Sequence, residues 1–69
     1  MSKVEWSAIE ALVSHAFEGG AMPERQDLVD IAFAADASDD MVDALDSLPS
    51  RPVPSLDALK EHLTTKDLI

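Results

Sequence analysis

The sequence predicts an all-α fold: a small four-helix domain with a short extended proline-rich arm between helices three and four. Apolar residues recur at intervals of three and four along most of the chain, which is the period of an amphipathic helix. Serine, proline and glycine stand where these stretches begin or end. A chain of 69 residues has room for one hydrophobic core, so residues 1–69 are expected to form a single domain.

The first helix is expected over residues 3–18. Ser2 and Glu5 have the spacing of a capping box at its start. Two glycines at 19–20 are expected to end it, because glycine accepts the left-handed conformation found at helix C-caps. The apolar stripe of this helix consists of Trp6, Ile9, Val13 and Phe17, with Leu12 and Ala16 beside it.

The second helix is expected over residues 23–35, with Pro23 in its first turn. Proline suits this position because the backbone N–H that it lacks would have no partner within the helix. Val29 and Phe33 lie about 100–140° around the helix from Leu28, so the apolar arc is unusually wide. Two interpretations stay open. Either the helix is wedged between two neighbours and both side chains are buried, or both face outward; a four-helix domain favours the wedge.

The third helix is expected over residues 39–48, with Ser38 as its N-cap and Pro49 preventing its continuation. At 100° per residue its two faces are chemically opposite. The apolar face, which needs a core, carries Met41, Ala44, Leu45 and Leu48. The opposite face, which favours water or a cationic partner, carries Asp39, Asp40, Asp43 and Asp46.

An extended arm is expected over residues 50–54, because residues before proline avoid the helical region. Val53 is its one large apolar side chain and is expected to fill the core. Ser55 is expected to cap the last helix, over residues 56–64, and residues 64–69 are expected to fray unless Leu68 and Ile69 fold back. The predicted core is Trp6, Phe17, Leu28, Ile31, Met41, Leu45, Leu48, Val53 and Leu59.

The order of these signals also resembles a known family. The shared pattern is an apolar residue with proline, Asp-Leu-Val and an alanine, an acidic helix ending in Leu-x-x-Leu-Pro, and a serine-capped final helix. It is carried by Met22, Pro23, Asp27, Leu28, Val29, Ala32, Asp39, Asp40, Leu45, Leu48, Pro49, Ser55 and Leu59. Over residues 9–63 the chain is similar to the small bacterial proteins called domain of unknown function 2795. That resemblance implies a compact helical domain and brings no activity or catalytic residues with it.

The chain is strongly acidic, with a formal net charge of −9 from fourteen acidic and five basic residues. Seven aspartates and no Lys or Arg stand between residues 26 and 50. Such a field repels phosphate backbones and anionic lipid, so direct nucleic acid binding and membrane binding are not expected. Three explanations of the charge stay open: a solvated surface that keeps the protein soluble, adaptation to high salt, and a docking face for a basic partner.

Several sites are excluded on residue type and spacing. The absence of cysteine removes disulfides and thiolate zinc sites, and His15 and His62 are expected on the surfaces of different helices. The acidic group around Asp36 lacks the alternating ligands and central glycine of an EF-hand. No metal or cofactor is therefore expected. No stretch suits a signal peptide or a membrane span, so a cytoplasmic location is the default expectation.

Asp46-Ser47-Leu48 matches the tripeptide at which acyl carrier proteins attach phosphopantetheine. In those proteins the serine begins a long helix, whereas Ser47 is expected at a helix end, two residues before Pro49. Because no serine, histidine and acid can be grouped either, we expect a protein that is not an enzyme.

The leading functional hypothesis is a non-enzymatic acidic protein-interaction module whose partner is a protein with a basic surface. The alternatives are a carrier or enzyme accessory domain, and an acidic regulator that mimics DNA. The sequence does not specify the partner, the oligomeric state or the biological process. The candidate contact residues are Asp39, Asp43, Asp46, Val29 and Phe33.

Overall fold

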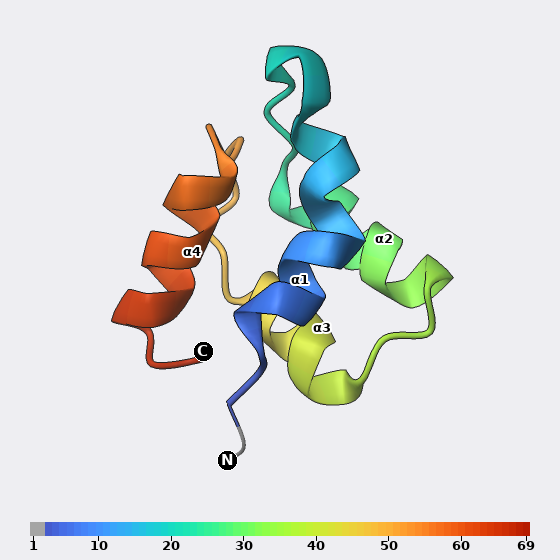
Figure 1. The fold of residues 1–69 in the computed structure, drawn as a ribbon, viewed down its shortest axis with the longest axis vertical. Helices are drawn as coiled ribbons and strands as arrows, with labels where there is room; N and C mark the ends of the chain where they lie inside the picture. The colour runs from blue at the N-terminus through green and yellow to red at the C-terminus, as the bar shows by residue number, and fades with distance from the viewer. Residues whose placement is uncertain (1–2) are drawn as a thin grey trace.

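Four α-helices and one 3-10 helix make up most of the protein in the computed structural model, which describes residues 3–69 (Figure 1). No β-strand occurs in this range, so the predicted all-α four-helix class is confirmed. The helices are α1 (Trp6–Val13), η1 (Ser14–Gly20), α2 (Arg25–Ala34), α3 (Asp39–Asp46) and α4 (Leu56–Thr65).

The first helix is shorter than predicted at both ends. It begins at Trp6 rather than at residue 3, and the backbone N–H of Val4 instead donates to the carbonyl of Leu68 at 2.8 Å. The capping box proposed for Ser2 lies outside the described residues. At Val13 the α-helix gives way to the tighter 3-10 turns of η1, a frequent ending for an α-helix.

The two glycines end the helical stretch, as predicted. Glu18 is extended, and Gly19 and Gly20 follow with φ of 68° and 80°, a region that glycine adopts most readily because it has no Cβ. The chain then turns back toward the start of α2.

Pro23 does not lie in the first turn of α2, contrary to the prediction. Glu24 is the N-cap, and its backbone N–H donates to the Asp27 carboxylate at 3.1 Å. Pro23 precedes the cap and is buried, and its carbonyl accepts the N–H of Val53 at 2.8 Å. The proline therefore joins the arm to the start of α2 rather than opening the helix.

Helix α2 packs against both α3 and α1, but the wide apolar arc is divided between core and solvent. Val29 is 6% exposed, whereas Phe33, one turn further on, is 66% exposed. Neither sequence-based interpretation holds for both residues. The neighbouring helices cover the middle of α2 and leave its last turn open.

Aliphatic side chains from all four α-helices and the arm form the centre of the core. Five of the predicted core residues are buried, namely Leu28, Leu45, Leu48, Val53 and Leu59. The other four only pack against its edge, because a domain of this size cannot enclose every large side chain. These four are Trp6, Phe17, Ile31 and Met41.

The serine caps were predicted correctly. Ser38 accepts the Met41 N–H at 3.3 Å, and Ser55 accepts the Ala58 N–H at 3.1 Å. Helix α3 ends at Asp46, two residues earlier than predicted, because Ser47 is already its C-cap before Pro49.

The C-terminal tail folds back instead of fraying, which is the alternative that the sequence left open. Asp67 adopts φ of 59°, and the N–H of Leu68 returns to the Leu63 carbonyl at 2.9 Å. Leu68 and Ile69 are half-buried against the core. The Lys3 ammonium lies 2.7 Å from the Asp67 carboxylate and joins the two ends of the described chain.

Truncating Leu45 is expected to lower the free energy of unfolding by about 3 kcal/mol, because Leu45→Ala leaves a cavity at a position that is 0% exposed. Phe33→Ala removes a larger side chain and is expected to cost less than about 0.5 kcal/mol, since that side chain is mostly in solvent. Urea unfolding followed by far-UV circular dichroism measures both. Equal losses in the two variants would contradict the burial of Leu45 in α3 and the exposure of Phe33 on α2.

Candidate functional site

The outer face of α3 is a row of carboxylates. Asp39, Asp43 and Asp46 are exposed, and their spacing of four and three residues places them on one side of the helix. The one ion pair within residues 3–69 joins Lys3 to Asp67, so no basic side chain of the described chain neutralises this row. We call Asp39, Asp43 and Asp46 the acidic face.

The two apolar candidate residues are not brought together. Val29 is buried in the core and is unavailable to a partner in the folded domain, so its assignment as a contact residue is wrong. Phe33 keeps an exposed ring and, with Met22 at 57% exposure, is one of the two exposed large hydrophobic side chains in residues 3–69. The apolar surface near the end of α2 is therefore one side chain and not a stripe.

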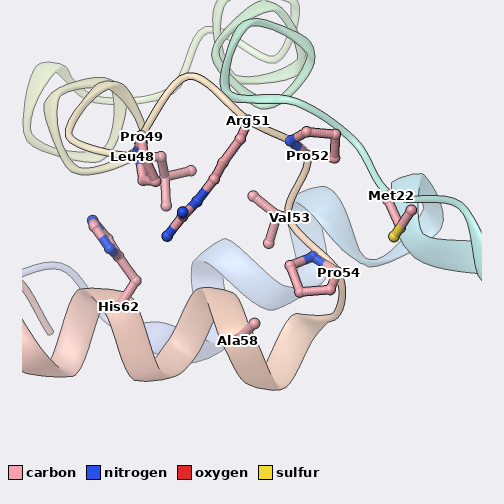
Figure 2. A pocket seen from close by; sticks show the side chains of 9 residues that line it. All are labelled: Met22, Leu48, Pro49, Arg51, Pro52, Val53, Pro54, Ala58 and His62. Atoms are coloured by element: carbon pink, nitrogen blue, oxygen red, sulfur yellow. The ribbon is translucent and has the colours of Figure 1, made fainter.

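A pocket that the sequence analysis did not identify lies between the proline-rich arm and α4 (Figure 2). Its volume is about 450 Å³. The segment before α2, the residues after α3, the arm and α4 each contribute to its wall. The lining residues are Met22, Leu48, Pro49, Arg51, Pro52, Val53, Pro54, Ala58 and His62. We call this cavity the arm pocket.

The arm pocket follows from the way the prolines hold the chain between α3 and α4. Residues before proline avoid the helical region, so no helix forms over residues 50–54. The chain bends at Ser50 and Arg51, where the Arg51 N–H donates to the Pro49 carbonyl at 2.8 Å, and then passes beside α4. The bond from the Val53 N–H to the Pro23 carbonyl and the buried Val53 side chain fix the arm against the start of α2. On the α4 side the wall includes Ala58, whose small side chain leaves space in front of the helix.

Two nitrogen-bearing side chains, Arg51 and His62, line an otherwise apolar wall. Figure 2 shows both pointing into the same opening, Arg51 from the arm and His62 from α4. No carboxylate lines the pocket. In a chain of net charge −9, this makes the arm pocket a local cationic site.

The structure also brings Ser47 to His62, a pair that the sequence analysis did not group. The Ser47 hydroxyl lies 3.5 Å from His62 Nε2 and donates to the Ala44 carbonyl at 2.6 Å. Within the described chain no carboxylate is hydrogen-bonded to His62. The serine therefore serves as a backbone cap at the end of α3, without the acid that orients the base in a catalytic triad.

Neither a metal site nor a membrane-spanning helix occurs in residues 3–69. No group of three or more His, Asp and Glu side chains there could hold a metal ion. None of the helices in this range has the length and apolar character needed to cross a bilayer. His15 is exposed on η1, on a different element from His62.

Comparison with known proteins finds no matching family model, no matching curated protein and no matching solved structure. The resemblance to domain of unknown function 2795 therefore stays a prediction.

Ser47 is expected to remain unmodified when the protein is incubated with a phosphopantetheinyl transferase and coenzyme A. Its hydroxyl is bonded to the Ala44 carbonyl and sits at a helix end rather than at the start of one. Intact-mass spectrometry provides the measurement, with an acyl carrier protein as the positive control. A mass gain that disappears in Ser47→Ala would overturn this expectation.

Salt is expected to stabilise the protein, because the acidic residues repel one another and a single ion pair occurs in residues 3–69. Raising KCl from about 0.1 M to about 1 M shortens the screening length about threefold. The expected rise in melting temperature is about 5 °C, or roughly 1 kcal/mol for a domain of this size. A variant with Asp39, Asp43 and Asp46 all changed to Lys should gain less. Equal gains would show that salt acts through apolar burial alone.

Proposed function

We propose that the protein is a non-enzymatic interaction module that binds a basic protein surface through the acidic face of α3. The observation that carries the proposal is the row formed by Asp39, Asp43 and Asp46, which is exposed and has no cationic partner in residues 3–69. Complementary charge steers association and selects the partner more than it adds affinity. The partner is therefore expected to present several Lys or Arg side chains at matching spacing.

The way α3 is held supports this role. Ala44 and Leu45 on its inner side are 1% and 0% exposed, and Ser38 fixes its first turn. The carboxylates are thus presented from a helix that cannot rotate without exposing its apolar side. Presenting charges from a fixed backbone lowers the conformational entropy lost on binding.

Phe33 supplies an apolar contact at the same end of the α2–α3 pair. It lies in the last turn of α2, and the short turn over 35–38 is closed by the Ala37 N–H donating to the Ala32 carbonyl at 2.9 Å. This turn leads directly to Asp39, the first residue of α3. Exposed aromatic rings are enriched at protein interfaces, so the proposed contact combines Phe33 with the first carboxylates of the acidic face.

Reversing the acidic face is expected to abolish partner capture. The test variant changes Asp39, Asp43 and Asp46 to Lys, and the matched control changes Glu10, Asp57 and Glu61 to Lys. Both sets are exposed, both alter the net charge equally, and Asp57 stands in a first helical turn as Asp39 does. In a pull-down with mass spectrometry, the control should retain the partners that the test variant loses.

Phe33→Ala should weaken capture of the same partners about tenfold, the scale of a contact-centre aromatic. Retention of every partner by both the charge-reversed variant and Phe33→Ala would refute the proposed surface. Duplex DNA added as a competitor separates the two forms of the hypothesis. Displacement of the partners by DNA would identify the acidic regulator that mimics DNA, and no displacement would identify a basic surface of another kind.

A further inference from the structure

We propose that the arm pocket binds a small amphipathic monocarboxylate, with the apolar part of the ligand on the proline-rich wall and its carboxylate on Arg51. Its residues lie on the arm, α4 and the segments beside them, and none belongs to the acidic face. This inference stands apart from the function proposed above, and either can fail without the other.

The apolar side of the pocket suits the body of such a ligand. Leu48 and Val53 form its floor and are 3% and 5% exposed, while Met22, 57% exposed, stands at its edge. A volume of about 450 Å³ lies within the range of roughly 300–1,000 Å³ typical of small-molecule sites. Burying an aromatic or aliphatic body here covers apolar surface that now faces water.

The charge of the pocket selects an anion. Arg51 makes no ion pair with any described residue, although the chain carries fourteen acidic side chains. A guanidinium presents a planar fork of N–H donors that matches a carboxylate with two parallel hydrogen bonds. The His62 imidazole lines the same opening and offers a second nitrogen. Its one side-chain hydrogen bond within residues 3–69, with Ser47, is long at 3.5 Å.

The charge and the apolar lining of the site favour a monocarboxylate over a more highly charged or an inorganic anion. One guanidinium and one imidazole face an apolar cavity in a molecule whose net charge is −9, so each further negative charge on the ligand adds repulsion without another partner. The apolar lining contributes only when the ligand has an apolar body. An inorganic anion would leave that lining in water.

The pocket is preformed. The Val53 N–H bonds to the Pro23 carbonyl at 2.8 Å, and the Arg25 guanidinium Nη1 donates to the Leu48 carbonyl at 3.4 Å. Three prolines restrict the backbone of the wall. A ligand therefore does not have to order the arm, which removes a common cost of binding.

The test uses the full-length protein labelled with nitrogen-15 and three probes that share one apolar body: 4-phenylbutyrate, 4-phenylbutanol and 4-phenylbutylamine. Amide chemical shifts are expected to move on titration with the carboxylate at Met22, Arg51, Val53, Ala58 and His62, all of which line the pocket. The carboxylate should bind about tenfold more tightly than the alcohol, the scale of one charge-assisted hydrogen bond. The amine should bind more weakly than the alcohol.

Two variants test separately the carboxylate contact at Arg51 and the apolar space beside Ala58. Arg51→Gln should weaken the binding of the carboxylate probe about tenfold and leave the affinity for the alcohol unchanged. Its matched control is Lys60→Gln, which removes one positive charge from α4 at a residue that does not line the pocket and should leave both affinities unchanged. Ala58→Leu should fill the pocket and weaken both probes, and the amide spectrum of each variant reports whether it is folded.

Equal affinity for the carboxylate and the alcohol would overturn the proposal, since the pocket would then be apolar only. An equal loss of affinity for the carboxylate in Arg51→Gln and Lys60→Gln would also overturn it, because the net charge of the protein, and not Arg51, would then account for the binding. If the same amides shift on raising the protein concentration without a probe, the occupant is a second copy of the chain and the ligand proposal is wrong. Failure of the charge-reversed α3 variant in partner capture has no bearing on these outcomes.

Discussion

Burial of one aliphatic face from each short helix, in a core that all of them share, is the constraint on which the structure depends. The α-helices have only eight or ten residues each, and isolated helices of this length are marginal in water. Ile9, Leu28, Leu45 and Leu59 come from α1, α2, α3 and α4, respectively, and each is 0% exposed. No helix is therefore expected to persist when this contact is lost.

The same constraint determines where the surface is free to act. Helix α3 turns Leu45 inward, so Asp43 and Asp46 face solvent, and the acidic face follows from the packing of its opposite side. Val53 is the one arm residue buried in the core, and the residues on either side of it border the arm pocket. An acidic face and a cationic pocket thus coexist on a chain of net charge −9.

These two sites complement opposite charges and differ in scale. The acidic face is an exposed row on one helix, which suits a basic protein surface. The arm pocket is a concave apolar site with Arg51 at its opening, which suits a small ligand. Both are built on the shared core, so a variant that unfolds the domain removes both, whereas surface variants at Asp43 or Arg51 separate them.

Features that depend on residues close together in the chain were predictable from the sequence. Helical periodicity, the caps at Ser38 and Ser55 and the stop at Pro49 all act within about one turn. They could therefore be predicted without knowing which segments pack against each other. The packing of the helices makes Val29 buried and Phe33 exposed, because burial depends on which part of α2 the other helices cover. The tertiary structure alone brought Met22 and Arg51 to one pocket with Ala58 and His62, since spacing along the chain does not encode contacts between separate segments.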